Sequence, residues 1–231
     1  MGSTRPTFVP WTGKMRRAAT VLVGIALAAL VLGVSVSLLT GHAFTWLLAS
    51  RYSLAAEAGL PRERMLDVAE QVRAFVVDGD AQTLPATVDG RPGFDAAAVS
   101  HLLDVRHVLD SARIVTGLLS ALLTIWLGVH IARKRTQGIA AALRAGAITS
   151  TVIVVLAAVI AVSDFERFFS AFHRLFFTSG TWTFSYDSLL IQTFPEPFWV
   201  TAGLAWGGLV LVLAAALWAT ARFMDGVKHT A

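Results

Sequence analysis

The chain has 231 residues, of which 55% are hydrophobic and only 15% charged, with a formal net charge of +4. Soluble globular proteins average about 45–50% apolar and about 25% charged residues, so this composition excludes an ordinary soluble domain. The sequence contains no cysteine, which excludes disulfides, thiolate metal sites and a thiol acyl-enzyme.

Four apolar segments are each long enough to cross a bilayer, which requires about 20 residues in helical form. They occupy residues 18–39, 112–132, 145–163 and 198–221. The first follows basic residues, as the core of a cleaved signal peptide does, but it exceeds the roughly 7–15 apolar residues of such a core. We therefore expect it to remain as an anchor. The sequence predicts an all-α membrane protein with four transmembrane helices and a helical extracytoplasmic cap.

The distribution of charge predicts the orientation in the membrane. Segments 1–17, 133–144 and 222–231 hold ten basic residues and one acid, a net charge of +9. Segments 40–111 and 164–197, together with Arg113 at the start of the second span, hold nine basic and fourteen acidic residues, a net charge of −5. Basic residues are enriched on the cytoplasmic side of membranes, so we expect both termini to be cytoplasmic. Positions near Asp89 and Ser179 should then be extracytoplasmic.

The basic residues do not indicate a nucleic-acid partner. Those of the inner segments face the anionic inner leaflet. The outer segments carry no clustered stripe of lysine and arginine of the kind that binds a phosphate backbone.

The first outer segment, residues 40–111, is predicted to form the cap. Pro61 suits the first turn of a helix, apolar residues then recur at three- and four-residue intervals, and Gly79 suits its end. This amphipathic helix is of the kind that lies on a bilayer or covers a bundle. Residues 78–94 are predicted to form a loop, and Asp95 to cap a helix that runs into the second span.

His101 and Asp104 lie three residues apart on this predicted helix and therefore share a face. A carboxylate beside an imidazole fixes the tautomer and stabilises the cation, as an orienting group does for a general base. The alternative is a solvated helix start at which both side chains contact water or headgroups. Spacing alone favours the solvated start.

The second outer segment, residues 164–197, is expected to continue from the third span as an aromatic helix that ends at Ser179 and Gly180. His173 lies among seven phenylalanines between positions 165 and 184. Burial among such rings lowers the pKa of an imidazole and keeps it neutral, as a general base must be. The alternative is an interfacial aromatic belt that holds a histidine at the level of the headgroups.

A metal site built from both histidines with Asp104, Asp164 or Glu166 is chemically feasible. No HExxH or other liganding spacing supports it, so we expect neither a metal nor a cofactor. GxSxG, GxGxxG and P-loop motifs are also missing from the sequence. Three functions stay open: acid–base chemistry on a lipid-bearing substrate, a non-catalytic module that binds lipid or a partner protein, and a metal-dependent lipid hydrolase.

Three motifs resemble a family of bacterial four-span membrane proteins to which the lipoprotein intramolecular transacylases belong. The first is His-Leu-Leu-Asp-Val at 101–105, before the second span. The second is the run from Phe169 to Phe177 around His173, and the third is the pattern from Trp182 to Phe198 that enters the last span. The resemblance covers most of the chain between residues 18 and 221.

This resemblance implies a cofactor-free acyltransferase in the bacterial plasma membrane, with its active site on the extracytoplasmic face. The catalytic histidines that it implies are His101 and His173, oriented by Asp104. The implied reaction moves the sn-2 acyl chain of a diacylglyceryl lipoprotein onto the amino group of its own N-terminal cysteine, which leaves a lyso-form lipoprotein. Such a transfer within one substrate needs no enzyme nucleophile. The aromatic residues expected to form the substrate pocket are Phe165, Phe169, Phe172, Phe176, Phe177, Trp182 and Tyr186.

Overall fold

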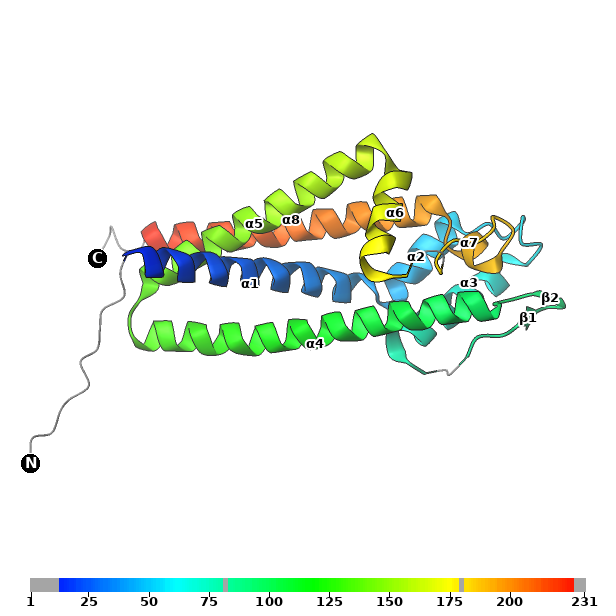
Figure 1. Cartoon of the computed structure of the whole chain (residues 1–231), viewed down its shortest axis with the longest axis horizontal. Helices are drawn as coiled ribbons and strands as arrows, with labels where there is room; N and C mark the ends of the chain where they lie inside the picture. Colours follow the sequence, from blue (N-terminus) through cyan, green and yellow to red (C-terminus); the bar gives the residue numbers. More distant parts are fainter. Residues whose placement is uncertain (1–12, 81–82, 179–180, 227–231) are drawn as a thin grey trace, which may run out of the picture.

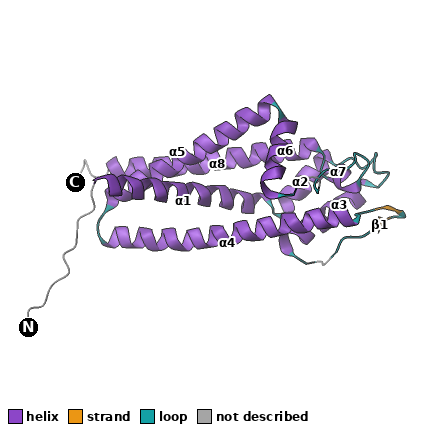
Figure 2. Ribbon diagram, in the orientation of Figure 1, coloured by secondary structure: helices purple, strands orange, loops and turns teal. Residues whose placement is uncertain are grey.

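The computed structural model describes residues 13–80, 83–178 and 181–226 and shows four long helices side by side, with a smaller cap at one end (Figures 1 and 2). Each long helix is long and apolar enough to cross a membrane. The predicted all-α fold with four spans is confirmed. The four helices are α1 (Gly13–Leu39), α4 (Ala96–Ala132), α5 (Thr136–Ser163) and α8 (Glu196–Gly226).

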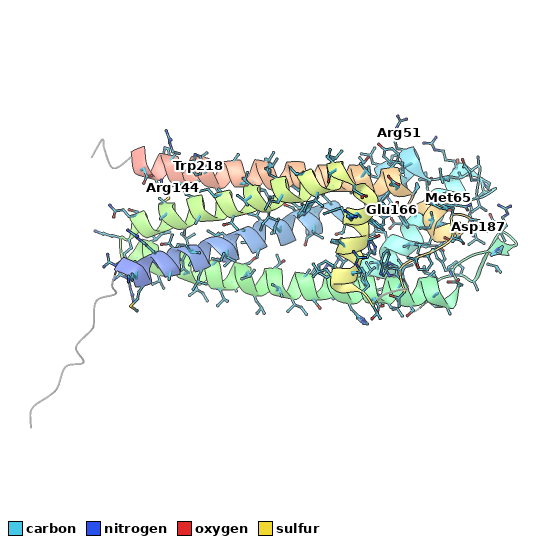
Figure 3. The ribbon with its side chains drawn as sticks, turned by 45° about the horizontal axis from the view of Figure 1, so that its top comes forward. Arg51, Met65, Arg144, Glu166, Asp187 and Trp218 are labelled. Carbon is cyan, nitrogen blue, oxygen red and sulfur yellow. The ribbon has the colours of Figure 1, made fainter. Side chains whose placement is uncertain are left out.

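The ends of the bundle differ in the segments that they carry. The start of α1, the turn between α4 and α5 and the end of α8 lie together, opposite the cap (Figure 1). Figure 3 places Arg144 and Trp218 toward this end and Met65 in the cap. At this end Arg144 of α5 forms an ion pair with Asp225 of α8. The described parts of the segments predicted to be cytoplasmic are thus at one end, and those of the segments predicted to be extracytoplasmic are at the other.

Helices α1, α5 and α8 pack against one another as the compact part of the bundle. Small residues allow α1 and α5 to approach closely, as is usual between helices in membranes. A Cβ atom added at Gly24 of α1 would lie 2.5 Å from the Cβ of Ala145 on α5. One added at Gly146 would lie 2.8 Å from the Cβ of Leu27. This contact leaves no room for a larger side chain.

Helix α4 has two distinct halves. Its buried residues are Ala98, His101 and Leu102, all near its start, and its apolar spanning window contains no buried residue. The first half packs in the cap, while the second is open to lipid and contacts mainly α1. The predicted cap at Asp95 is confirmed, because its carboxylate accepts a hydrogen bond from the Ala98 amide at 2.7 Å. The helix runs unbroken from the cap into the second span, as predicted.

The cap folds from the chain between α1 and α4. Its helices are α2 (His42–Tyr52) and α3 (Arg62–Arg73), and α3 continues as a π-helical turn, η1 (Ala74–Asp78). The structure confirms the predicted helix start after Pro61 and the predicted stop at Gly79, whose φ is 73°. The sequence analysis missed α2. It also missed the hairpin of β1 (Thr87–Val88) and β2 (Arg91–Pro92) within the predicted loop.

Two arginines of α4 attach it to the cap. The Nε of Arg106 donates to the Phe75 carbonyl at 2.6 Å, and the same guanidinium lies 4.4 Å from the centre of the Phe75 ring. Two turns further along α4, Arg113 donates to the Val77 carbonyl at 2.6 Å. Both acceptors belong to η1. The start of α4, and with it His101, is therefore held against the cap.

The expectation that an aromatic helix continues the third span is wrong. The chain breaks at Asp164, which has φ −163° and ψ 94° and accepts a hydrogen bond from the Arg167 amide at 2.9 Å. Asp164 thereby caps a separate helix, α6 (Phe165–Phe176), which crosses from the outer end of α5 toward α4 (Figure 1). The predicted stop at Ser179 and Gly180 lies outside the described residues. Helix α7 (Leu189–Thr193) then leads into α8.

Candidate active site

His101 lies in the second turn of α4, in the half of that helix that belongs to the cap. Its side chain is only 7% exposed. The imidazole packs edge-on against the Phe177 ring at 4.9 Å between centroids and against the Phe184 ring at 5.6 Å. Its neighbours Ala98 and Leu102 are part of the cap core. The cap and the aromatic segment after α6 thus enclose this histidine together.

His173 lies in the last turn of α6 and is 9% exposed. Its Nδ1 atom is 2.8 Å from the carbonyl oxygen of Phe169, one turn earlier. A carbonyl oxygen only accepts, so Nδ1 carries the proton, and the lone pair of the neutral ring is on Nε2. The rings of Phe169 and Trp182 pack on the imidazole at 4.0 and 4.8 Å. The available base at this position is therefore Nε2.

The structure brings the two histidines together. Their ring centroids are 6.0 Å apart and their planes are inclined by 31°. Phe177 contacts both imidazoles, at 4.9 Å from His101 and 5.6 Å from His173. One imidazole is supplied by the start of α4 and the other by the end of α6, so the pair depends on the way α6 crosses the bundle.

Burial keeps both imidazoles neutral. Burial, and after it the nearby His173, lower the pKa of His101 to about 4 against the opposing effect of Asp104. Burial also lowers the pKa of His173, against the smaller effect of its hydrogen bond to the Phe169 carbonyl. Charged imidazolium is disfavoured in surroundings made largely of aromatic rings. At neutral pH the site therefore holds two uncharged imidazoles, each able to accept a proton.

Asp104 acts on His101 through its charge. Within the described part of the chain no hydrogen bond joins the two side chains, and the buried Nδ1 of His101 has no partner. The half-buried carboxylate raises the pKa of the imidazole. Its role as the group that orients His101 stays a prediction.

The predicted pocket residues divide into three groups. Phe169, Phe177 and Trp182 pack directly on the histidine rings, and Phe172 meets His173 edge-on at 5.6 Å. A second layer is formed by Phe165, 5.8 Å from Phe169, and by Phe176, 5.1 Å from Phe172. Tyr186 is 91% exposed and lies outside this cluster of rings.

Phe184 is a site residue that the sequence analysis did not single out. Its ring contacts His101 at 5.6 Å. The sequence carries a signal for it, because the aromatic residues Trp182 and Phe184 alternate with the polar Thr183. Side chains of an extended segment alternate between two faces, so the contact of Trp182 with one histidine placed Phe184 near the other.

Carboxylates do not gather around the histidine pair. In the ranges that the structure describes, no three His, Asp or Glu side chains are placed to share a metal ion. Of the candidate acidic ligands, Asp164 and Glu166 are exposed, and Asp104 is half-buried. The side chains that surround the imidazoles are aromatic and offer no oxygen ligand.

The fold and the site together define a membrane-integral protein with four spanning helices, a helical cap and a neutral histidine pair between them. The family model described as the lipoprotein intramolecular transacylase Lit matches residues 20–199. The chain therefore belongs to the Lit family of acyltransferases. This excludes the non-catalytic module and the metal-dependent hydrolase as the class of the protein.

The fold is shared with crystal structures of Lit from Bacillus cereus. One, at 17% identity, superimposes with a TM-score of 0.80 and covers 95% of this chain and 100% of that chain. A variant of the same protein in which one histidine is replaced by arginine has a TM-score of 0.76 at 17% identity, over 94% of this chain and 95% of that one. The comparison with curated proteins gave no significant match.

Proposed function

We propose that this chain moves the sn-2 acyl chain of a diacylglyceryl lipoprotein to the amino group of its own N-terminal cysteine, with His101 and His173 handling the protons. The observation that carries the proposal is the pair of buried, neutral imidazoles 6.0 Å apart within a wall of aromatic rings. Ester-to-amide transfer needs a base for the amine and an acid for the departing oxygen. Two neighbouring imidazoles can supply both.

The tautomer of His173 suggests which proton transfer this histidine performs. Its Nε2 holds the lone pair and takes a proton from the substrate amine as the nitrogen attacks the ester carbonyl carbon. A C–N bond forms and the carbonyl oxygen becomes an oxyanion. When this intermediate collapses, the C–O bond to the glyceryl group breaks and the glyceryl oxygen takes up a proton from the imidazole pair. The products are an amide and a free glyceryl hydroxyl, and the enzyme recovers its starting state.

The aromatic wall favours transfer over hydrolysis. Water that reached the ester would compete with the amine, and the rings that cover both imidazoles exclude it. The substrate is long and flexible, so its amine and its ester must be held together for reaction. Orientation of this kind contributes up to about 7–11 kcal/mol in well-aligned intramolecular reactions. The site thus needs no nucleophile of its own.

The active site faces the extracytoplasmic side in this proposal. The segments predicted to be cytoplasmic carry a net charge of +9, and those predicted to be extracytoplasmic carry −5 when Arg113 is counted with them. The rule that basic residues remain in the cytoplasm then places the histidine pair at the outer leaflet. Its substrates are lipoproteins anchored in that leaflet, and the lipid around them is the second partner.

The test is mass spectrometry of a lipoprotein co-expressed with the protein, which distinguishes an acyl chain on the cysteine nitrogen from one on the glyceryl oxygen. We expect His101→Ala and His173→Ala each to abolish the lyso-form. The double variant should be little worse than either single one, because the two groups act in one coupled proton transfer. Asp104→Asn should be milder, since its charge acts through His101.

His107→Ala is the matched control, because His107 is exposed on the same helix. At equal expression, this variant should convert the lipoprotein to the lyso-form as the wild type does. Wild-type conversion by either His101→Ala or His173→Ala would refute the two-histidine mechanism. A wild type that produces no lyso-form would refute the proposed reaction itself.

A further inference from the structure

Trp182 carries a polar atom that the fold leaves unused. Its indole Nε1 is buried and has no hydrogen-bond partner among the described residues. Buried polar groups in native proteins are almost always paired, and an exception calls for an explanation. Other tryptophans of this chain follow the rule: Trp199 donates to the Phe194 carbonyl at 2.9 Å and Trp206 to the Leu32 carbonyl at 3.4 Å.

The unused donor lies at the histidine pair. The Trp182 ring is 4.8 Å from the His173 ring, and their planes are inclined by only 34°. In this near-stacked arrangement the N–H bond lies in the plane of the indole and does not point at the face of the imidazole. The His173 Nδ1 proton is engaged by the Phe169 carbonyl. No described group accepts a hydrogen bond from the indole N–H, which therefore remains available to a ligand.

The chemistry of the indole restricts what that ligand group can be. An indole nitrogen donates one hydrogen bond and accepts none. Its partner must be an acceptor, which excludes the ammonium form of an amine and admits a carbonyl oxygen. The ester carbonyl is the acceptor that a substrate brings to this site, and its oxygen gains negative charge as the amine attacks.

We propose that Trp182 is a third catalytic residue, whose indole N–H donates a hydrogen bond to the acyl carbonyl oxygen and stabilises the oxyanion. The inference rests on the proposed function. The tryptophan neither gains nor loses a proton during the reaction. The amine proton passes to His173, the glyceryl oxygen is protonated on departure, and the indole holds the oxygen that becomes negative between these steps. A donor fixed in place before the reaction is effective because it needs no reorganisation.

The test is the kinetics of Trp182→Phe with a synthetic diacylglyceryl lipopeptide in detergent micelles. Phenylalanine keeps an aromatic ring on His173 but has no donor. We expect kcat to fall by about 100-fold, the lower end of the range for loss of one oxyanion donor, with KM changed less than about threefold. Trp182→Ala should have nearly the same kcat, because both variants lack the N–H group. If Trp182 contributed to the rate only by packing its ring on His173, Trp182→Phe would keep the wild-type rate and only Trp182→Ala would lose it.

A diether lipopeptide, which has no ester carbonyl, separates catalysis from binding. As a competitive inhibitor it should have the same Ki with the wild type and with Trp182→Phe. A raised Ki would mean that Trp182 holds the lipid rather than the oxyanion, and would overturn the inference. If the phenylalanine variant fails to fold, 3-benzothienylalanine at position 182 retains the indole shape with sulfur in place of N–H, and should show the same loss of kcat.

Trp126→Phe is the matched control. The Trp126 ring also packs on a histidine, His130, at 4.3 Å, but at the other end of α4. This variant should keep the wild-type rate. If the wild type converts the lipopeptide and Trp182→Phe retains the wild-type rate, the inference about Trp182 is overturned but the proposed function is not. A wild type that converts no lipopeptide overturns the proposed function and this inference together.

Discussion

The two imidazoles reach the same neutral state through different surroundings. His101 lies between the cap core and two phenylalanine rings, with one nitrogen unpaired in the described part of the chain. His173 has a ring nitrogen bonded to its own helix and a second one free to act. Because the pKa of each is lowered, folding favours the neutral form, and the stability of the protein must depend on pH.

The expected pH dependence follows from the direction of these shifts. An unfolded histidine titrates near 6.5, whereas burial lowers the pKa of His101 to about 4. Between these values the unfolded chain binds more protons, so stability rises with pH in this window and is lost as pH falls through it. From pH 7 to pH 5 the His101 contribution should fall by about 2 kcal/mol. Thermal unfolding in detergent should show a smaller decrease for His101→Gln than for the wild type.

His107→Gln is the control for this measurement, since His107 is exposed on the same helix. It should retain the pH dependence of the wild type. An identical decrease in His101→Gln and the wild type between pH 7 and pH 5 would show that His101 is not held neutral by folding.

At the scale of elements, the position of α5 decides where α6 and His173 lie. The buried stripe of α1 consists of Gly24, Ala28, Val31 and Ser35, at intervals of three and four residues. Small side chains along it let α5 approach, and α5 ends at the residue that caps α6. The small-residue contact between α1 and α5 therefore positions one half of the histidine pair from a distance.

We expect Gly24→Ala to destabilise the protein by about 1–3 kcal/mol, the usual cost of overpacking. The new Cβ would lie 2.5 Å from the Cβ of Ala145 and 3.1 Å from its backbone carbonyl carbon, so the helices must move apart. Gly203→Ala on α8 is the matched control, because nothing lies within 4 Å of its added Cβ. Its unfolding midpoint should be unchanged or slightly raised, since alanine favours helix. Equal midpoints for the two variants would contradict the close contact.

For the whole molecule, the absence of cysteine makes the proposed orientation directly testable. Thr87→Cys in the hairpin of the cap and Gln137→Cys near the start of α5 each introduce one exposed thiol without a change in charge. In intact cells an impermeant maleimide should label the first and spare the second until the membrane is opened. Labelling of Gln137→Cys in intact cells would reverse the orientation.

The aromatic surroundings of the histidine pair predict activity without a metal ion. The rings that contact the imidazoles offer no oxygen ligands, and of the candidate acids Asp164 and Glu166 are exposed while only Asp104 is half-buried. Conversion of the lipopeptide should persist after dialysis against a chelator. Loss of conversion that one divalent ion specifically restores would contradict this.

Features that depend on local sequence could be predicted. The four spans follow from length and hydropathy, and Asp95 and Gly79 act as helix signals because capping involves only neighbouring residues. The break at Asp164 carried the same kind of signal as Asp95, but it lies between two apolar stretches and was hidden by them. The position of α6 depends on how it packs across the bundle, which no local pattern encodes.

The residues of the candidate site could be singled out from the sequence, but their contacts could not. His101 and His173 were found from their sequence motifs, and the structure places them 6.0 Å apart. Helical spacing put Asp104 on the same face as His101, yet their side chains are not hydrogen-bonded in the described chain. Tyr186 was grouped with the pocket because it is aromatic and near in sequence, but it is 91% exposed. Burial is set by the fold rather than by residue type.

The hydrogen bond of His173 to Phe169 has a consequence for turnover. Donor and acceptor are four residues apart in the same helix, so they move together. His101 belongs to α4, which the chain joins to α6 only through α5. Both histidines are more than nine-tenths buried, so a substrate must displace some of the side chains that cover them. The Nδ1 proton of His173 stays on the carbonyl of its own helix when these contacts change, so the basic Nε2 atom is already in place when the substrate enters.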